Sequence, residues 1–334
     1  MTAPDSSWDG VDVLVTGAGG FIGSHLVEAL VHAGANVRAF VRYNSRNDYG
    51  RLEDCEPAVL EEVEVFTGDL GNPEAVAGGV EGREIVLHLG ALIPIPYSYR
   101  HPREYVTANV EGTINVLEAS RRLGVRRVVH TSTSEVYGTA QVVPIPEEHV
   151  LHPQSPYAAS KIAADHLALS YARSFDTPVV VVRPFNTFGP RQSARAVIPT
   201  IISQALTRDV VELGSLTPTR DLTFVGDTAA GMMLAATAEG VEGEVINLGT
   251  GKEWSIGQLA DDILRLVGVE LEIRSVDERQ RPPQSEVERL VADWSKAERL
   301  LGWRPAVELE EGLLRVIEWM RGAIGRFKPT IYNV

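Results

Sequence analysis

The stretch VDVLVTGAGGFIGSHLVEALVHAGA, residues 11–35, decides the fold that the sequence predicts. It opens with the apolar run of a buried strand, turns sharply through glycines, and continues with the apolar periodicity of a helix. Such a turn lets a diphosphate approach backbone N–H groups and the positive end of the helix dipole. A merely tight strand-to-helix turn is the alternative. The turn supplies five predicted dinucleotide-binding residues: Gly17, Gly20, Phe21, Ile22 and Gly23.

The alternation of strands and helices continues along the chain. Further strands are predicted at 36–42, 63–70, 83–91, 125–133 and 177–186, and long helices at 103–124 and 156–175. Near-continuous apolar strands separated by helices indicate an α/β fold, a Rossmann-type doubly wound parallel sheet covered on both faces. We predict an NAD(P)-binding domain at 1–186 and a smaller α/β substrate domain at 187–334. A strand near 243–248 is a candidate to rejoin the main sheet.

The composition narrows the possible partners. The 334 residues carry a net charge of -14, which argues against nucleic acid or an anionic membrane as the main partner. The single cysteine, Cys55, excludes an intrachain disulfide. No apolar run reaches a membrane-spanning length, and the N-terminus has no apolar targeting core, so we expect a cytoplasmic protein. No HExxH or carboxylate–histidine cluster is present, so we expect no metal.

The end of the second strand bears on the choice of cofactor. NAD sites often carry an acid there for the ribose hydroxyls, whereas an arginine accommodates a 2′-phosphate. The stretch FVRYNSRND (40–48) offers Arg42 and Arg46 before its first acid, Asp48. NADP is therefore favoured, with NAD as the alternative. Asp69, at the tip of the third strand, is either an adenine contact or a turn residue.

Two polar motifs follow the fifth strand. TSTSE (131–135) places hydroxyls and one carboxylate at the strand end, and YAASK places Tyr157 and Lys161 four residues apart on a helix. Residues at that spacing share a helix face, so we expect the ammonium to lower the pKa of the phenol. Tyr157 then becomes a plausible base for a sugar hydroxyl. In the loop 93–102, Tyr97 and Tyr99 are candidates to shape the pocket, although a packing role is nearly as plausible.

The motifs GAGGFIG, HLGA, TSTSEVYG, YAASK and RPFNTFGP, in this order, resemble the extended short-chain dehydrogenase/reductase superfamily. The likeness spans nearly the whole chain and lies in the branch of nucleotide-sugar epimerases, dehydratases and decarboxylases. It implies a tightly held nicotinamide cofactor and an NDP-sugar bound by the C-terminal domain. It also implies a homodimer built from the helices at 103–124 and 156–175.

The resemblance also assigns roles to single residues. Thr133 matches the hydroxyl beside the sugar's 4-oxygen, Tyr157 the base and Lys161 its helper. Further cofactor contacts are implied at Arg42, Asp69, Leu70, Ala91 and Asn109, the last supporting the lysine. Substrate contacts, chiefly to the diphosphate, are implied at Asn186, Arg191, Arg220 and Arg281. Taken alone, each arginine favours an ordinary role, Arg220 as a surface residue paired with Asp221 and Arg281 as a solvated loop residue, but an anionic diphosphate needs such groups.

The reaction within this branch depends on Glu135. A 4-epimerase needs no second base, whereas a 4,6-dehydratase must also remove the C5 proton and expel the C6 hydroxyl as water. The pair Ser134–Glu135 resembles the serine-containing form of GDP-mannose 4,6-dehydratases, and further segments are similar to the dehydratases of the legionaminic-acid route, which act on N-acetylhexosamine nucleotides. Ser134 stands where a common dehydratase pattern has aspartic acid.

The sequence therefore predicts a nucleotide-sugar 4,6-dehydratase, with Thr133, Ser134, Glu135, Tyr157 and Lys161 as catalytic residues. The predicted reaction is C4 oxidation, C5 deprotonation, water loss and C6 reduction by the recycled cofactor. A 4-epimerase and then a decarboxylase acting on UDP-glucuronate are the alternatives. A non-catalytic NADP-binding sensor on the same fold is the alternative outside enzymes.

Overall fold

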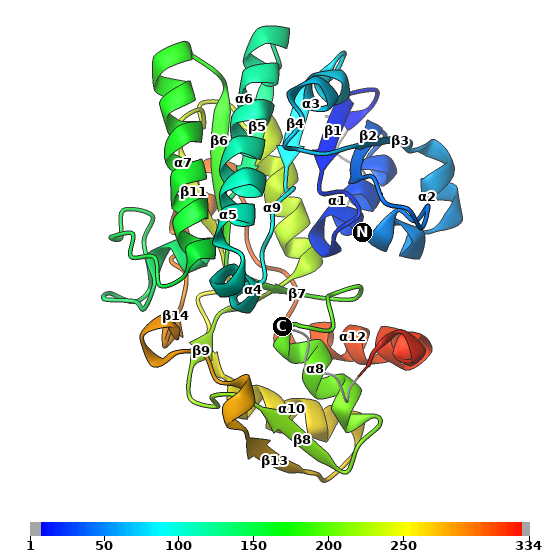
Figure 1. Cartoon of the computed structure of the whole chain (residues 1–334), viewed down its shortest axis with the longest axis vertical. Coiled ribbons are helices and arrows are strands. Elements are labelled where there is room, and N and C mark those ends of the chain that lie inside the picture. The colour runs from blue at the N-terminus through cyan, green and yellow to red at the C-terminus, as the bar shows by residue number, and fades with distance from the viewer. Residues whose placement is uncertain (1–7, 329–334) are drawn as a thin grey trace.

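The computed structural model describes residues 8–328 and is built around a parallel sheet (Figure 1). The sheet has seven strands in the order β11–β6–β5–β4–β1–β2–β3, and every neighbouring pair is parallel. The strands are β1 (Asp12–Thr16), β2 (Asn36–Arg42), β3 (Glu64–Gly68), β4 (Ile85–His88), β5 (Arg127–Thr131), β6 (Val179–Pro184) and β11 (Val245–Leu248). This is the strand order of a doubly wound dinucleotide-binding sheet, and it confirms the predicted fold class.

The central strands are apolar along their length because both of their faces are buried. In β1, Val13 and Val15 belong to one core cluster, and Leu14 belongs to the cluster on the other face. In β6, Val180 and Val181 divide in the same way. Side chains alternate across a strand, so a sheet covered on both sides needs apolar residues at every position.

Helices cover the two faces of this sheet. On one face α1 (Phe21–His32) packs against α9 (Val225–Thr237), and on the other α6 (Gly112–Leu123) lies between α3 (Pro73–Val80) and α7 (Pro156–Phe175). The predicted helix at 103–124 is a nearly continuous run of three segments, α5 (Pro102–Tyr105), the π-helical η3 (Val106–Glu111) and α6. Two shorter helices, α2 (Pro57–Glu62) and α4 (Ile95–Arg100), lie in connections that follow β2 and β4.

The second lobe lies beyond the carboxyl ends of the strands, in the lower half of Figure 1. Its apolar core is separate from the two sheet clusters and includes residues from α8 (Val197–Ala205), α10 (Ile256–Val267) and α12 (Leu309–Ala323). Short strands complete it: β7 (Asn186–Phe188) with β10 (Leu222–Phe224), β8 (Val210–Leu213) with β13 (Glu272–Ser275), and β9 (Thr219–Arg220) between β12 (Trp254–Ser255) and β14 (Arg289–Leu290).

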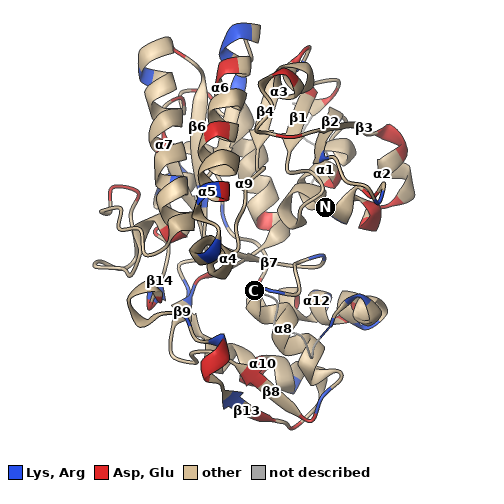
Figure 2. Cartoon of the chain, in the orientation of Figure 1, with Lys and Arg blue, Asp and Glu red and all other residues tan. Residues whose placement is uncertain are grey.

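The chain leaves the first lobe after residue 186, and three later elements return to it. β11 pairs with β6 at the edge of the main sheet, and α9 and α11 (Ser295–Leu301) pack in the core beneath it. The strands of the sheet are largely uncharged in Figure 2, whereas acidic residues colour α2 at the periphery. Within residues 8–328, no helix has the length and apolar character needed to cross a membrane.

Candidate active site

The glycine turn lies where the strand order reverses, between β1 and β4. Gly17 follows β1 with a φ of 70°, and a Cβ added there would stand 2.8 Å from the backbone nitrogen of Gly90, just after β4. A Cβ on Gly23 would overlap the carbonyl oxygen of Gly17. The backbone can therefore make this close approach only without side chains, and it leads directly into α1. The turn fits a dinucleotide diphosphate at the helix N-terminus.

The remaining predicted cofactor contacts surround this turn. Arg42 Nε at the end of β2 lies 3.7 Å from Asp69 Oδ2 after β3, and the two side chains are 81% and 61% exposed. Asp69 Oδ1 also accepts the backbone N–H of Gly71 at 2.8 Å, as a turn residue does. Leu70 packs so closely on Gly90 that a Cβ there would lie 2.5 Å from its Cδ1.

Ala91 follows Gly90 and is partly buried. Phe21 and Ile22 begin α1 and are also partly buried. These residues are accordingly beside the turn, as the sequence places them.

The structure brings Tyr157 and Thr133 together. Tyr157 is in the first turn of α7, and Thr133 caps the short 3-10 turn η4 (Ser134–Tyr137) by accepting the backbone N–H of Glu135 at 3.2 Å. Burial raises the pKa of the Tyr157 phenol, a hydrogen bond with Thr133 lowers it, and the charge of Glu135 raises it, for a net rise. The expected lowering by Lys161 is therefore wrong for this structure, because desolvation of the phenolate dominates.

Lys161 is fully buried one turn further along α7. Its Nζ donates to the carbonyl oxygen of Thr131 at 2.7 Å, at the end of β5. Burial lowers its pKa to about 8, and the negative charge of Asp165 acts in the opposite direction. A cation whose pKa lies this close to neutrality is typical of a functional site.

Asn109 lies in the π-helical segment η3, a kind of irregularity that is frequent at functional sites. Its Oδ1 accepts the backbone N–H of Leu92 at 2.7 Å, and its Nδ2 donates to the Leu92 carbonyl and to Ser160 Oγ, both at 2.9 Å. Ser160 directly precedes Lys161. Asn109 thus fixes the loop after β4 against α7, and its contact with the lysine is indirect.

Ser134 and Glu135 occupy the first two positions of η4. Ser134 is buried, with 3% of its surface exposed, whereas Glu135 is only partly buried. The Glu135 carboxylate accepts no hydrogen bond from the residues that the structure describes, yet its charge acts on both Tyr157 and Arg220. Glu135 is therefore a carboxylate held near the candidate base with its oxygens available.

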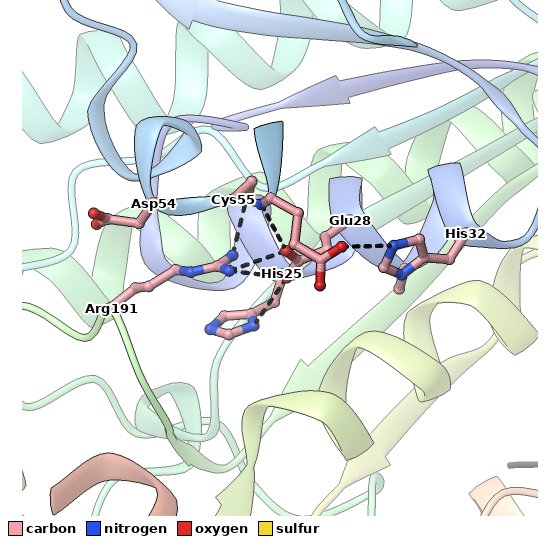
Figure 3. Close-up of a pocket in the computed structure, with 8 residues that line it drawn as sticks. His25, Glu28, His32, Asp54, Cys55 and Arg191 are labelled. Carbon is pink, nitrogen blue, oxygen red and sulfur yellow. Dashed lines mark hydrogen bonds and ion pairs between the residues drawn. The ribbon is translucent and has the colours of Figure 1, made fainter. Parts of the chain in front are cut away.

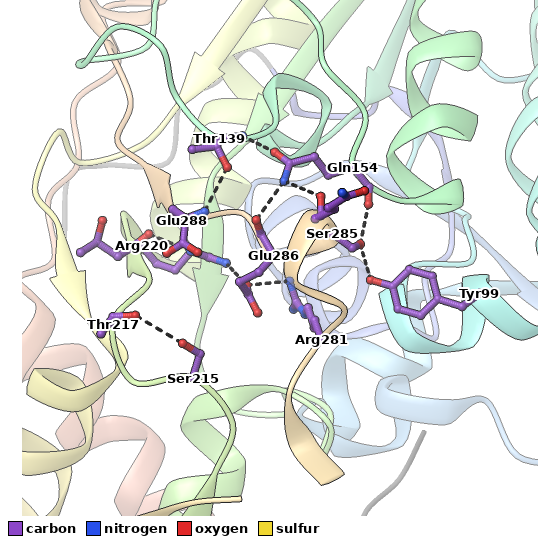
Figure 4. A network of polar contacts seen from close by, with 12 residues as sticks. Tyr99, Thr139, Gln154, Ser215, Thr217, Arg220, Arg281, Ser285, Glu286 and Glu288 are labelled. Atoms are coloured by element: carbon purple, nitrogen blue, oxygen red, sulfur yellow. Dashed lines mark hydrogen bonds and ion pairs between the residues drawn. The ribbon is translucent and has the colours of Figure 1, made fainter. Parts of the chain in front are cut away.

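The predicted substrate arginines Arg220 and Arg281 converge on one residue that the sequence did not suggest (Figure 4). Their guanidinium groups lie 3.2 and 3.4 Å from Glu286 Oε1. Asn186, at the start of β7, has a buried Oδ1 without a hydrogen-bond partner among the described residues. Two arginines that converge in this way form a cationic site of the kind that binds an anionic ligand.

Arg191 does not join this group. Its guanidinium makes two hydrogen bonds to Glu28 on α1, at 3.0 and 3.1 Å, and a third to Cys55 Sγ at 3.4 Å, beside His25 (Figure 3). The backbone of Arg191 has a φ of 68° and its side chain is 9% exposed. The structure thus places Arg191 in a contact between the loop after β7 and α1, away from Arg220 and Arg281.

A chain of hydrogen bonds ties the loop that carries Glu286 to the first lobe. Tyr99 Oη lies 2.5 Å from Ser285 Oγ, which in turn donates to the carbonyl of Gln154. Gln154 Nε2 donates to the carbonyl of Glu286 at 2.9 Å. Of the two tyrosines proposed for the pocket, Tyr99 therefore faces this loop, whereas Tyr97 donates to Glu104 at 2.9 Å. The sequence offered no local signal for Gln154, Ser285 or Glu286.

Comparison with known proteins decides the family. The family model described as GDP-mannose 4,6-dehydratase matches residues 14–316. The chain belongs to the GDP-mannose 4,6-dehydratase family. It is an enzyme of the extended short-chain dehydrogenase/reductase branch of nucleotide-sugar dehydratases and epimerases.

The relatives that the chain resembles include both 4-epimerases and 4,6-dehydratases. The chain is 35% identical to the UDP-glucose 4-epimerase of Mycolicibacterium smegmatis over 315 residues, covering 92% of this chain and 98% of the relative. It is 34% identical to the dTDP-glucose 4,6-dehydratase of Streptomyces antibioticus over 328 residues, covering 96% and 95%.

A solved structure agrees in fold with this family member. The dTDP-glucose 4,6-dehydratase DesIV of Streptomyces venezuelae, as a double mutant with NAD bound, superposes with a TM-score of 0.86 at 29% identity, covering 96% of this chain and 100% of that one. That relative was solved with NAD, so it gives no support to the preference for NADP.

Proposed function

We propose that the chain is a nucleotide-sugar 4,6-dehydratase that forms a 4-keto-6-deoxy sugar nucleotide. The observation that carries the proposal is Glu135, a carboxylate near Tyr157 that has no hydrogen-bond donor among the described residues. A 4-epimerase has no step that needs such a base. A dehydratase needs one to remove the proton from C5 of the 4-keto sugar.

Each residue of the site has a role in this reaction. Tyr157 takes the proton of the 4-hydroxyl, with Thr133 hydrogen-bonded beside it and Lys161 charged behind it. Glu135 removes the C5 proton, and the C6 hydroxyl leaves as water after taking up a proton. A nicotinamide cofactor held at the glycine turn between Gly17 and Gly23 would supply the hydride acceptor for C4 and the hydride donor for C6, so the net change in the sugar is the loss of one water. Ser134 is a poor general acid, which leaves Glu135 itself or a relayed proton for water loss.

The substrate is proposed to lie between the lobes with its diphosphate at Arg220 and Arg281. Asn186 is proposed as a further contact, because its buried Oδ1 has no hydrogen-bond partner among the described residues. Arg191 is the weaker candidate, because substrate binding would require it to leave Glu28. The resemblance to the legionaminic-acid-route enzymes favours an N-acetylhexosamine nucleotide as substrate.

The finer choice of cofactor remains NADP with NAD as the alternative. NADP is supported by Arg42 at the end of β2 and the lack of an acid in that strand end. The pairing of Arg42 with Asp69 and the exposure of both side chains weaken this support. Measured affinities decide the choice: NAD binding much tighter than NADP overturns it.

The test of the function is product mass. The enzyme is incubated with GDP-mannose, dTDP-glucose, UDP-glucuronate and UDP-N-acetylglucosamine, and the products are analysed by mass spectrometry. We expect the loss of one water from one of these substrates. A product of unchanged mass with inverted C4 would establish a 4-epimerase, which the likeness to the M. smegmatis enzyme makes the second candidate. Loss of carbon dioxide from UDP-glucuronate would establish a decarboxylase, and no reduction of the cofactor by any sugar would revive the sensor.

Glu135→Gln separates the two half-reactions. The variant should still reduce the cofactor by oxidising C4, seen as nicotinamide absorbance, but it should not eliminate water. Glu148→Gln, which removes an exposed acid outside the site, is the control with unchanged turnover. Full dehydratase activity in Glu135→Gln would remove Glu135 from the mechanism.

The assembly proposed is a homodimer through α6 and α7, in the cytoplasm. The two helices lie side by side on one face of the sheet, and large apolar side chains at their ends, Leu123 and Phe175, are 48% and 52% exposed. Light scattering on the purified protein tests the dimer, and a monomeric mass would contradict it.

A further inference from the structure

Asp165 is a fully buried carboxylate that the proposed reaction does not use. It lies on α7, four residues after Lys161 and eight after Tyr157, so the three share one helix face. Its Oδ2 accepts hydrogen bonds from Ser132 Oγ at 2.8 Å and from Arg183 Nε and Nη2 at 3.1 and 3.0 Å. These hydrogen bonds compensate the burial of the carboxylate and hold its side chain in one position.

The contacts of this carboxylate bracket the end of β5. His130 Nε2 lies 3.2 Å from its Oδ1, and Ser132 donates to its Oδ2. His130, in β5, and Ser132, directly after it, both contact Asp165 and therefore face the same side. Between them, the carbonyl of Thr131 accepts the hydrogen bond from Lys161. One turn of α7 is therefore held against three consecutive residues, and the next residue is Thr133.

The ion pair of Asp165 with Arg183 also connects to the far end of η4. Arg183 Nη1 donates to the hydroxyl of Tyr137 at 3.0 Å, and that hydroxyl donates to Asn247 Oδ1 at 2.7 Å. The guanidinium carbon also lies 5.0 Å from the centre of the Tyr137 ring. Tyr137 is the last residue of η4. The segment that carries Glu135 is thus tied to the Asp165–Arg183 pair at both ends.

We propose that Asp165 is a positioning residue for the reaction proposed above. Through Ser132 at one end and through Arg183 and Tyr137 at the other, it holds the segment with Thr133 and Glu135 against α7, and it places a negative charge one helical turn from Lys161. The contacts of Asp165 are seen in the structure, whereas their effect on turnover rests on the proposed function.

The charged and titratable groups around Lys161 support an electrostatic effect of Asp165 on it. His130 on β5 and His88 on β4 interact with it, and burial lowers the pKa of His130 to about 4 and that of His88 well below its usual value, so both rings are neutral at neutral pH. Burial raises the pKa of Asp165, but His130 and the charges of Arg183 and Lys161 lower it further than burial raises it. Asp165 is therefore ionised, and it balances buried cations on its own helix and on β6.

Nuclear magnetic resonance of the lysine side chains tests the electrostatic part without turnover. The sequence has four lysines, at positions 161, 252, 296 and 328, so selective ¹³C labelling gives a simple spectrum. In Asp165→Asn, the titration midpoint of Lys161 should fall by about one pH unit or more. Asp227→Asn is the control, because Asp227 is also buried but, among residues 8–328, its carboxylate accepts only the backbone N–H groups of Ala306 and Val307. An unchanged Lys161 titration in folded Asp165→Asn overturns the proposal.

If Asp165→Asn does not fold, the double variant Asp165→Asn/Arg183→Gln replaces it, because removing both charges avoids an unpaired buried guanidinium. In that variant the Lys161 midpoint should also fall, and an unchanged midpoint overturns the proposal equally.

Ser132→Ala tests the positioning part with one hydrogen bond removed. We expect kcat to fall about tenfold, the cost of one hydrogen bond to a charged group, with cofactor affinity and the Lys161 titration unchanged. A kcat equal to that of the wild type overturns the positioning role. If the wild-type enzyme turns over no nucleotide sugar, the proposed function fails, and the Lys161 titration still decides what Asp165 does.

Discussion

The carboxylate of Glu286 lies 3.2 Å from the guanidinium of Arg220, whose side chain is 8% exposed. Glu286 therefore forms an ion pair with the arginine that is proposed to bind the substrate's diphosphate. The same carboxylate is 3.4 Å from the guanidinium of Arg281. The Glu286 carboxylate and a bound diphosphate would compete for Arg220 and Arg281, and their negative charges would repel each other.

Replacement of Glu286 by Gln should therefore tighten the binding of a nucleoside diphosphate. We expect about a tenfold gain in affinity, or ~1.4 kcal/mol, measured by calorimetry with UDP and GDP. Glu288→Gln, which removes the same charge from an exposed neighbour on the same loop, should leave affinity nearly unchanged. Unchanged or weaker binding in Glu286→Gln would mean that the acid orients the arginines for the diphosphate.

The pH dependence of activity should report Lys161. Burial lowers its pKa to about 8, so kcat/KM should fall as pH rises through 8 and the ammonium is lost. Lys161→Arg should move this decline to higher pH, because a guanidinium stays charged. A wild-type profile that is flat to pH 10 would contradict the assignment.

Unfolding would not explain that decline. The pKa of Lys161 is lowered in the folded protein from the ordinary 10.5, so between pH 8 and 10.5 the unfolded chain binds more protons at this group than the folded one. Its contribution to the free energy of unfolding therefore rises with pH over that window. Circular dichroism at each pH checks that the protein stays folded.

Cofactor preference should respond to Asp69. Asp69→Asn removes the partner of Arg42 and frees that guanidinium for a 2′-phosphate. The ratio of NADP to NAD affinity should rise about two- to fivefold, the small effect expected for an exposed ion pair. Dinucleotide titrations followed by fluorescence measure it. Asp48→Asn, which frees Arg46 in the same way, is the matched comparison, and a falling ratio in Asp69→Asn would exclude Arg42 from cofactor selection.

The sequence by itself determined the architecture and half of the site. Strands buried on both faces are apolar at every position, helices have their own period, and the glycines between Thr16 and Ser24 mark one turn, so each of these features is local in the chain. The spacing of Tyr157 and Lys161 is local as well, and Asp165 lies at the next equivalent position of the same helix, where its face could have been noticed.

Only the tertiary structure decided what these groups meet. Arg220 and Glu286 are 66 positions apart, and no periodicity links them. The ion pair of Arg191 with Glu28 and the burial that raises the pKa of Tyr157 also depend on the fold and not on local sequence. Charge pairing and desolvation depend on which distant segments exclude water together, and that is fixed by packing of the whole chain.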